Sequence, residues 1–337
     1  MQVMAAPEAL EAWLAAHVPG WRGPARLRRL TGGQSNPTWA VEAPSGLYVL
    51  RQKPLGPVLP SAHAVDREAR VMRALAGTDV PVPRVHGLCD DPAVFGSMFF
   101  VMDHVAGRVF FDPLLPDWTP ADRAALYDSL NATAAAIHRI DPAAVGLGDY
   151  GRPGDYAARQ LARWTKQYRA SETHRIEAME RLIDWLPANL TEGDDSGLVH
   201  GDFRLDNVIV HPTEPRVVAV LDWELSTLGA PVTDFANHMM MWRIPPGLFR
   251  GMAGADLAAL GIPSEAEYLA RWCARTGRDG PPAGWEFHVI LSLFRLAAII
   301  QGIARRAADG TAADPQAAEV GAKAGALAEI AWGLARG

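Results

Sequence analysis

Cysteine is nearly absent from this chain of 337 residues, which holds only Cys89 and Cys273. Two cysteines this far apart are too few for a disulfide framework, and neither has the spacing of a metal-binding motif. Such sparse cysteine usage is typical of a reducing compartment. We therefore expect a cytoplasmic protein.

An excess of positive charge is also missing, because the formal net charge is −6 at neutral pH. Proteins that bind a nucleic-acid backbone normally carry a clustered basic surplus. The composition, with 49% hydrophobic and 21% charged residues, is that of a soluble globular protein large enough for two lobes. We expect no nucleic-acid partner.

Long uninterrupted apolar runs are lacking as well. The most apolar segment, 285–306, contains Glu286, His288 and Arg295, whereas a membrane span needs roughly 20 apolar residues in succession. The first 21 residues carry Glu8 and Glu11 and resemble an amphipathic helix more than a signal peptide. We predict a buried late helix, no membrane partner and no export.

The first third of the chain has the pattern of a small antiparallel sheet. Short apolar segments alternate with turn residues such as GGQSNP and PSG, and one segment, 61–77, has helical spacing of its apolar residues. This pattern predicts one helix and five strands, at 26–31, 38–43, 47–52, 83–89 and 98–105.

From Thr119 onward the apolar period is mostly 3.6 residues. The pattern predicts helices over 119–140, 154–170, 172–186, 233–242, 263–276 and the C-terminal region, with strands only within 198–210 and 215–225. The sequence therefore predicts an α+β protein of two lobes, 1–105 and 106–337.

The stretch LVHGDFRLDNVIV, residues 198–210, places charge inside an apolar run. With the following strand it predicts a hairpin that gathers Asp202, Asn207 and Asp222 at one end. Phosphoryl transfer needs a carboxylate near the attacking hydroxyl, oxygen ligands for Mg²⁺ and a group that holds the triphosphate. Two alternatives remain: a turn in which these side chains bond local amides, and a metal hydrolase that uses His200, Asp202 and His211.

The segments GGQSNPTW, YVLRQKP, LPSAHAVDRE, FVMDHVAGRVF, RQLARWTKQY, HGDFRLDN and LDWELSTLGAPVTDFA occur in the same order as in a known family. Over about residues 25–305 the chain resembles aminoglycoside phosphotransferases and choline-kinase-like small-molecule kinases. It is most similar to the phosphotransferase domains associated with acyl-CoA dehydrogenases. The resemblance implies a bilobal protein-kinase-like fold, with a small antiparallel N-lobe sheet carrying one helix and a mainly helical C-lobe.

The same resemblance assigns roles around the loop. Asp202 would orient or deprotonate the acceptor hydroxyl, and Asn207 and Asp222 would hold Mg²⁺. Asp234 would bond the backbone of the loop from a helix start, and His200 would support the loop. ATP and Mg²⁺ are the cofactors that it implies.

In the small lobe, the glycine-rich turn offers backbone amides to phosphates, and the candidates there are Gly33, Gln34 and Ser35. A plain hairpin turn is the alternative.

Arg51 occupies the position where kinases usually have lysine, a departure that leaves the phosphate anchor open between Arg51 and Lys53. Glu68 would position that cation, unless it is simply a solvated helix charge. The carbonyl of Asp103 and the amide of Val105 would meet adenine.

The acceptor is expected to be small, because only eleven residues separate Asp222 from Asp234, too few for the activation segment of a protein kinase. On the helix around 159–169, Arg159, Arg163 and Lys166 share one face. This basic face suits an anionic acceptor and repels a cationic one, unless it is only a solvated surface. The candidate substrate residues are Arg159, Arg163, Trp164, Glu224 and Arg243.

The predicted function is therefore transfer of the γ-phosphate of ATP to a hydroxyl of a small molecule, with a hydroxyacyl-CoA of acyl-CoA metabolism as the substrate hypothesis. The alternatives are an antibiotic kinase of the aminoglycoside or macrolide type and a choline-like alcohol kinase. A non-catalytic pseudokinase is the alternative of another class, but it would be expected to lose Asp202, Asn207 or Asp222. No oligomeric state is indicated.

Overall fold

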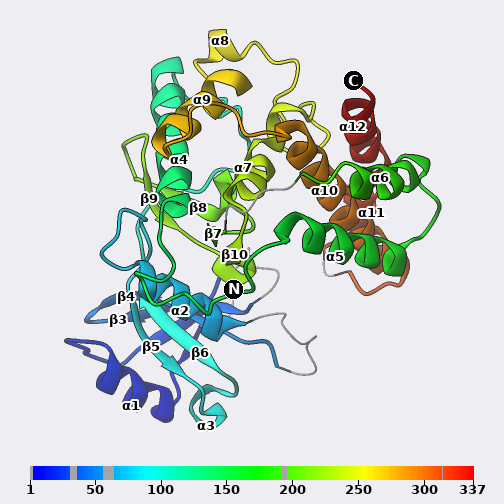
Figure 1. The fold of residues 1–337 in the computed structure, drawn as a ribbon. Coiled ribbons are helices and arrows are strands. Elements are labelled where there is room, and N and C mark those ends of the chain that lie inside the picture. Colours follow the sequence, from blue (N-terminus) through cyan, green and yellow to red (C-terminus); the bar gives the residue numbers. More distant parts are fainter. Residues whose placement is uncertain (1–2, 31–35, 56–63, 192–195, 313) are drawn as a thin grey trace. The chain divides into compact units, whose positions relative to one another are not determined.

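The computed structural model describes residues 3–30, 36–55, 64–191, 196–312 and 314–337 (Figure 1). Its contacts divide the chain into two compact units. Unit 1 comprises Met1–Val109, Val145–Leu147 and Asn207–Ser226, and unit 2 comprises Phe110–Ala144, Gly148–Asp206 and Thr227–Gly337. The predicted lobes 1–105 and 106–337 follow chain order, whereas grouping by contacts joins the segment 207–226 to the N-terminal part. The division into lobes stays a prediction.

The described residues of unit 1 form a six-stranded antiparallel sheet in the order β1-β2-β3-β4-β6-β5 (Figure 1). The strands are β1 (Val3–Ala5), β2 (Arg26–Arg29), β3 (Thr38–Ala43), β4 (Gly46–Gln52), β5 (Val85–Cys89) and β6 (Phe99–Asp103). The five predicted strands are confirmed. The sixth, β1, pairs with β2 where the sequence predicted the start of a helix. That helix begins only after Pro7, because proline disfavours helical backbone at the residue before it.

Helices cover both faces of this sheet. Leu10 and Leu14 of α1 (Glu8–His17) pack with Leu50 of β4 in one core cluster. Successive side chains of a strand point to opposite faces, so Arg51 points away from that cluster, and it meets Glu68 of α2 (Val65–Leu75). The predicted single helix is thus α2. Helix α1 is the amphipathic helix predicted near the N-terminus, whereas the short α3 (Pro92–Phe95) was not predicted.

Unit 1 also contains the hairpin of β8 (Val208–Val210) and β9 (Val217–Val220), followed by the 3-10 turn η2 (Trp223–Leu225). Arg108 pairs with Val210, and the Val220 amide donates to the Pro81 carbonyl at 2.8 Å. A Cβ at Gly107 would lie 2.2 Å from the Ile209 side chain. Glycine at this position therefore lets the chain after β6 pass directly over the hairpin.

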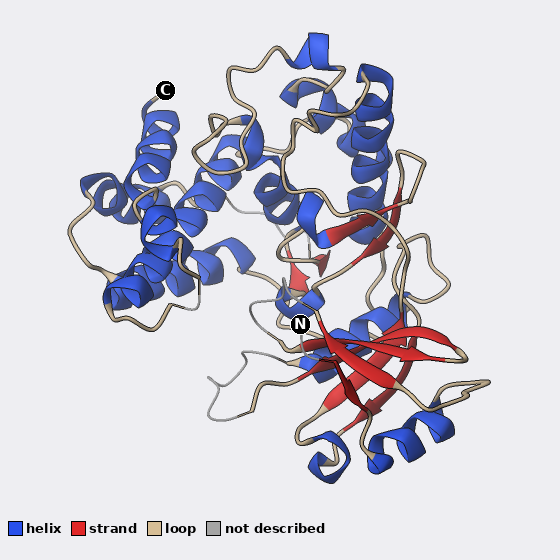
Figure 2. Cartoon of the chain, turned by 180° about the vertical axis from the view of Figure 1, so that it is seen from behind, coloured by secondary structure: helices blue, strands red, loops and turns tan. Residues whose placement is uncertain are grey.

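Unit 2 is mainly helical (Figure 2). Its helices are α4 (Pro120–His138), α5 (Tyr156–Ser171), α6 (Glu177–Ala188), α7 (Pro231–Met239), α8 (Leu257–Leu260), α9 (Glu265–Arg275), α10 (Trp285–Ala308), α11 (Ala317–Gly321) and α12 (Ala324–Arg336). Two short strands, β7 (Gly197–Val199) and β10 (Thr227–Gly229), pair antiparallel. The 3-10 turns are η1 (Leu205–Asn207) and η3 (Met240–Trp242). The sequence did not predict β10, because three residues are too short for a period to show.

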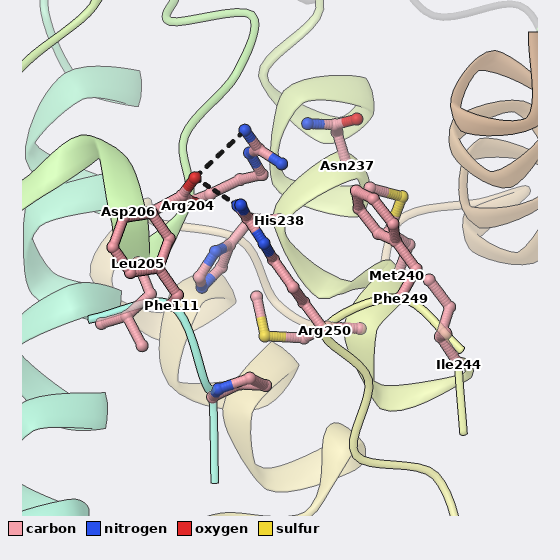
Figure 3. Close-up of a pocket in the computed structure, with 12 residues that line it drawn as sticks. Phe111, Arg204, Leu205, Asp206, Asn237, His238, Met240, Ile244, Phe249 and Arg250 are labelled. Atoms are coloured by element: carbon pink, nitrogen blue, oxygen red, sulfur yellow. Dashed lines mark hydrogen bonds and ion pairs between the residues drawn. The ribbon is translucent and has the colours of Figure 1, made fainter. Parts of the chain in front are cut away.

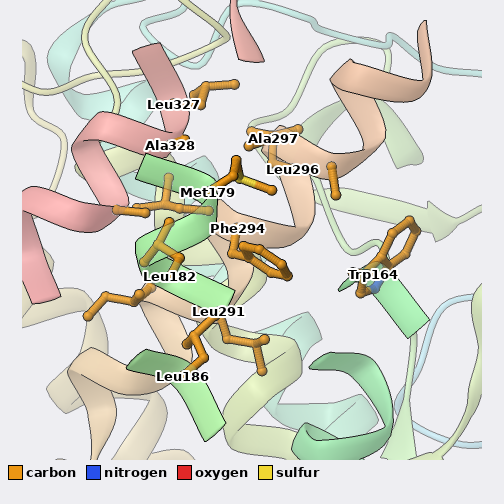
Figure 4. Close-up of a cluster of buried hydrophobic side chains, with 14 of the residues drawn as sticks. Trp164, Met179, Leu182, Leu186, Leu291, Phe294, Leu296, Ala297, Leu327 and Ala328 are labelled. Carbon is orange, nitrogen blue, oxygen red and sulfur yellow. The ribbon is translucent and has the colours of Figure 1, made fainter. Parts of the chain in front are cut away.

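Helix α10 forms the centre of unit 2. By length and composition it could cross a membrane, but 83% of its apolar window is buried within the protein. Leu291 and Phe294 pack with Met179 and Leu182 of α6 and with Leu327 of α12 (Figure 4). The prediction of a buried helix is confirmed, and this helix also carries the Arg295 that supports the loop described below.

Candidate active site

In unit 1 the hairpin brings two predicted metal ligands to the same end. The Leu221 amide donates to the Asn207 carbonyl at 2.8 Å, so Asn207 lies directly opposite the residue before Asp222. Asp222 has a left-handed backbone (φ 64°), and its side chain is 33% exposed. The predicted convergence of Asn207 and Asp222 is confirmed. Asp202 belongs to unit 2, and its convergence with them stays a prediction.

One arginine joins the charged groups of unit 1. The Arg51 Nε lies 2.7 Å from Glu68 Oε2, and its Nη2 lies 2.5 Å from Asp222 Oδ1 and 3.7 Å from Glu224 Oε2. Lys53 follows β4, and its carbonyl accepts a hydrogen bond from Ser97 Oγ at 2.6 Å. Of the two candidate anchors, Arg51 is therefore the one that contacts Glu68.

The cluster is buried and holds more acid than base. Burial alone would lower the pKa of Arg51, but Glu68, Asp222 and Glu224 outweigh it and raise that pKa. Burial raises the pKa of Glu68 to about 7, although Arg51 opposes the shift. Three carboxyl groups thus face one guanidinium, an arrangement that favours an added cation.

The predicted adenine contacts lie after the end of β6. The Asp103 amide donates to the Arg84 carbonyl at 2.9 Å, and its carboxylate accepts from His86 Nε2 at 2.6 Å. The chain has no regular structure at Val105. Gly33, Gln34 and Ser35 lie outside the described residues, and the nucleotide roles of all five residues stay predictions.

In unit 2, Asp202 lies in the loop after β7, and its carboxylate is partly exposed. His200 is fully buried, and its Nδ1 accepts from the Asp202 amide at 3.2 Å. The Asp202 side chain is 26% exposed, and its Oδ1 lies 3.2 Å from Arg204 Nε. The predicted supporting place of His200 is confirmed, and a carboxylate on this loop is accessible to an acceptor.

Asp234 holds the loop from the first turn of α7. Its carboxylate accepts from the amides of His200 and Gly201, both at 2.8 Å, and from His138 Nε2 at 3.2 Å. Trp272 Nε1 in turn donates to His138 Nδ1 at 2.9 Å. Burial alone would raise the pKa of Asp234, but the His138 hydrogen bond and the neighbouring histidines hold it below its usual value. These contacts confirm the predicted place of Asp234, and sequence periodicity gave no signal for Trp272.

Arg295 is a further support of this loop, a role that the sequence did not predict for it. Its Nη2 donates to the Gly201 carbonyl at 2.6 Å from the middle of α10. A basic residue inside an otherwise apolar helix was the signal that could have singled it out.

The predicted substrate residues of unit 2 have different surroundings. Arg159 donates to the carbonyls of Arg152, at 2.7 Å, and Gly154, so it closes the loop before its own helix. Arg243 is held by Glu265 and by Glu286.

The other two predicted residues lie side by side on α5. The Trp164 indole is 5% exposed, and the Arg163 guanidinium lies 5.2 Å from its ring centroid. The substrate roles of all these residues, and of Glu224 in unit 1, stay predictions.

A small cavity, of about 30 Å³, lies next to the loop in unit 2 (Figure 3). Arg204, which contacts Asp202, also reaches Asp206 at 3.4 Å, and Arg250 binds the same Asp206. Most other lining residues are apolar: Phe111, Pro113, Leu205, Met240, Met241, Ile244 and Phe249. At this volume the cavity has room only for water-sized groups.

The zinc-hydrolase alternative gains no support. Across 3–30, 36–55, 64–191, 196–312 and 314–337, no three His, Cys, Asp or Glu side chains are grouped so that they could hold a metal ion. The His200 ring is instead engaged with the backbone of its own loop.

Comparisons with known proteins agree on one family. The model of the phosphotransferase enzyme family matches residues 26–288. A crystal structure of a candidate aminoglycoside phosphotransferase from Ralstonia eutropha is 51% identical, with a TM-score of 0.91 and 99% of each chain covered.

Curated relatives are longer proteins. The chain is 45% identical over 315 residues to acyl-CoA dehydrogenase family member 10 of Mus musculus, covering 93% of this chain and 29% of that protein. It is 43% identical over 303 residues to family member 11 of Rattus norvegicus, covering 88% and 39%. The chain thus spans less than half of the curated relatives that it matches.

More distant structures show the same fold. Choline kinase from Cryptosporidium parvum is 11% identical with a TM-score of 0.64, covering 96% of this chain and 94% of that one. Aminoglycoside phosphotransferase APH(4)-Ia, in a ternary complex with AMP-PNP and hygromycin B, is 18% identical with a TM-score of 0.62, covering 96% and 99%. The kinase-like α+β fold predicted from the sequence is confirmed.

Proposed function

The chain belongs to the phosphotransferase enzyme family and is a small-molecule phosphotransferase, and we propose that it transfers the γ-phosphate of ATP to a hydroxyl group with the help of Mg²⁺. The observation that carries this proposal is the acid-rich cluster in which Arg51 joins Glu68 to Asp222. The complex of APH(4)-Ia with AMP-PNP supports the choice of an adenine nucleotide.

The residues of the hairpin fit a magnesium ion. Mg²⁺ prefers hard oxygen ligands, and Asn207 and Asp222 offer an amide and a carboxylate oxygen at one end of the hairpin. The negative excess around Asp222 adds electrostatic attraction. When bound, the metal would neutralise charge that develops on the phosphate oxygens.

Arg51 and Glu68 would act as a pair. Arginine stays charged and can bond phosphate oxygens with two parallel N–H groups. Glu68 occupies the Nε side of the guanidinium, which orients the remaining N–H groups of Arg51 for that task.

Asp202 would orient the acceptor hydroxyl and accept its proton as the acceptor oxygen bonds to the γ-phosphorus and ADP leaves. Arg204 contacts the Asp202 carboxylate and orients it. Asp234 fixes the backbone on which Asp202 is mounted, through the amides of His200 and Gly201. Arg204 and Asp234 thus hold the Asp202 carboxylate in place before the reaction, so that it need not rearrange during the reaction.

For the acceptor we propose a hydroxyacyl-CoA. The names of the curated relatives, acyl-CoA dehydrogenase family members, support a link to acyl-CoA metabolism. An aminoglycoside is the second candidate, favoured by the name of the structure that is 51% identical.

The enzyme proposal is tested with Asp202→Asn. The exchange keeps the shape of the side chain but removes the proton acceptor, so transfer should fall by about 10²–10⁴-fold while ATP binding is retained. ADP release in a coupled assay and nucleotide titration measure the two quantities. Asp279→Asn, at an exposed carboxylate, is the matched control. Full activity of Asp202→Asn would exclude the assigned role.

The acceptor is tested by a panel of a 4-hydroxyacyl-CoA, hygromycin B, a macrolide and choline. We expect turnover with the acyl-CoA ester. Background turnover with it and clear turnover with another alcohol would replace the acceptor and leave the phosphotransferase proposal standing.

A further inference from the structure

In unit 2 an arginine is buried beside the catalytic loop, and not all of its hydrogen-bond donors have a partner among the described residues. Arg295 is 8% exposed, and one of its terminal nitrogens binds the Gly201 carbonyl. Its Nε is buried and has no hydrogen-bond partner among the described residues. A buried donor without a partner costs free energy, so a ligand that satisfies it would be stabilised.

A second arginine lies on the same indole. The guanidinium of Arg163 is 5.2 Å and that of Arg295 is 5.3 Å from the centroid of Trp164. Within the part of the chain that the structure describes, neither forms an ion pair with a carboxylate. Partial burial, and then the positive charge of Arg295, hold the pKa of Arg163 below its usual range. The two cations therefore repel each other.

The Tyr156 phenol adds a neutral donor to this group. It is 7% exposed, and burial, followed by the negative charge of Asp234, raises its pKa to about 12, although Arg295, Arg163 and Arg159 act in the opposite direction. A phenol with such a pKa keeps its proton at physiological pH and donates a hydrogen bond.

Another pair of arginines in unit 2, Arg181 and Arg336, also lies on one indole, that of Trp332, but Arg181 is paired with Glu177. Arg243 is paired with Glu265 and Glu286, and Arg275 with Asp128. Arg163 is exposed, but Arg295 is buried, and two neighbouring cations of which one is buried are costly to hold together unless an opposite charge joins them. The presence of these two cations beside the catalytic loop therefore indicates an anion supplied by a ligand.

We propose that Arg163, Arg295 and Tyr156 form a subsite for an anionic group, carboxylate or phosphate, on the hydroxyl acceptor. That the bound molecule is the hydroxyl acceptor rests on the proposed phosphotransferase function. Arg295 binds the carbonyl of Gly201, the residue before Asp202, so an anion held here would fix the acceptor's distance from the Asp202 carboxylate. The subsite selects acidic alcohols and rejects cationic amino alcohols.

The first experiment compares Arg163→Gln with the wild type on acceptors of matched length. These are 4-hydroxybutyrate, 4-hydroxybutyl phosphate, the neutral 4-hydroxybutyramide and the cationic 4-amino-1-butanol. The wild type should favour the anions, and Arg163→Gln should raise KM for them by about 10-fold with little change in kcat, because a charge-assisted hydrogen bond is lost.

For the neutral 4-hydroxybutyramide, KM and kcat of Arg163→Gln should equal those of the wild type. The two anions distinguish a carboxylate from a phosphate source. Arg169→Gln removes the same charge from the same helix at a residue paired with Glu180, and it should not alter KM for any acceptor. Equal effects of Arg163→Gln on all four acceptors, or a wild-type preference for the amine, would overturn the subsite.

A second experiment does not depend on turnover. With saturating Mg-ADP, inorganic phosphate or acetate should raise the melting temperature of the wild type and of Arg169→Gln but not of Arg163→Gln. If no alcohol is phosphorylated yet this difference is seen, the anion site stands and the proposed function fails. If alcohols are phosphorylated and the difference is absent, the anion subsite fails and the proposed function stands.

Discussion

The two units differ in the sign of the charge that each leaves in excess. In unit 1 the single guanidinium of Arg51 meets three carboxyl groups, those of Glu68, Asp222 and Glu224. In unit 2 the guanidinium groups of Arg163 and Arg295 share one indole, with no carboxylate partner among the described residues.

The difference indicates which charge a ligand of each unit would carry. Charge imbalance in a partly buried cluster lowers stability unless a ligand of opposite sign compensates it. The acid-rich cluster of unit 1 therefore suits a cation, and the arginine pair of unit 2 suits an anion. A phosphotransferase that uses Mg²⁺ and an acidic acceptor would supply both.

The largest effect is expected from Asp222→Asn, which reduces the negative excess around Arg51 in unit 1 at the most exposed carboxylate of that cluster. Transfer should fall by about 10²–10³-fold, because both a metal ligand and the partner of Arg51 are weakened. Initial rates over a Mg²⁺ titration measure the loss. Asp66→Asn, at an exposed residue of α2, is the control, and an Asp222→Asn enzyme with an unchanged Mg²⁺ dependence would refute the cation site.

The next effect is expected from Asp234→Asn in unit 2. The exchange removes the charge that binds the amides of His200 and Gly201, so the free energy of unfolding should drop by about 3 kcal/mol. Urea unfolding measures the change. Asp279→Asn should leave the midpoint where it is, and an equally unchanged midpoint for Asp234→Asn would show that the network is not holding the loop.

A pH-dependent effect is expected from two buried histidines of unit 2. Burial lowers the pKa of His238 to about 4, and it lowers that of His288 to about 4 as well. Both are neutral in the folded protein near pH 6, whereas the unfolded chain takes up protons there. Stability should therefore fall as the pH drops from about 6.5 toward 4, by about 1.4 kcal/mol per pH unit for each histidine.

Melting temperatures between pH 7 and pH 4.5 test this expectation. His238→Gln should reduce the slope of melting temperature against pH by the contribution of one proton. His174→Gln, at an exposed histidine, should leave that slope unchanged. A wild-type curve that is flat across this range would contradict the neutral state of both rings.

The smallest effect is expected from Glu68→Gln in unit 1. Arg51 would lose its 2.7 Å partner but keep Asp222, so KM for ATP should rise by about 10-fold with kcat less affected. Because the pKa of Glu68 is raised to about 7, KM of the wild type should fall as the pH rises through that value, and the variant should lose this dependence. Steady-state kinetics from pH 6 to 8 measure both, with Asp66→Asn as the control.

Some parts of the candidate site could be predicted because their signal is local. Asn207 and Asp222 flank two short apolar strands, and pairing of adjacent strands through a short turn brings their ends together. Asp234 stands at a helix start, and its bonds to the loop backbone follow the family pattern.

Other parts had no local signal. The first strand, β1, forms only because β2 offers it an edge, and Trp272 reaches His138 from a helix far along the chain. The surroundings of Arg159 and Arg243 also differ from a simple basic face, since backbone carbonyls hold the first and two glutamates hold the second.

The sequence by itself determined the family and the α+β fold, and it predicted the chemistry of the loop at 200–207, because periodicity and motif spacing act over neighbouring residues. Only the tertiary structure decided that Arg51 contacts Glu68 and that Arg163 shares an indole with Arg295. These contacts join residues far apart in the chain, and whether a charge is compensated depends on burial and distance, which packing alone sets.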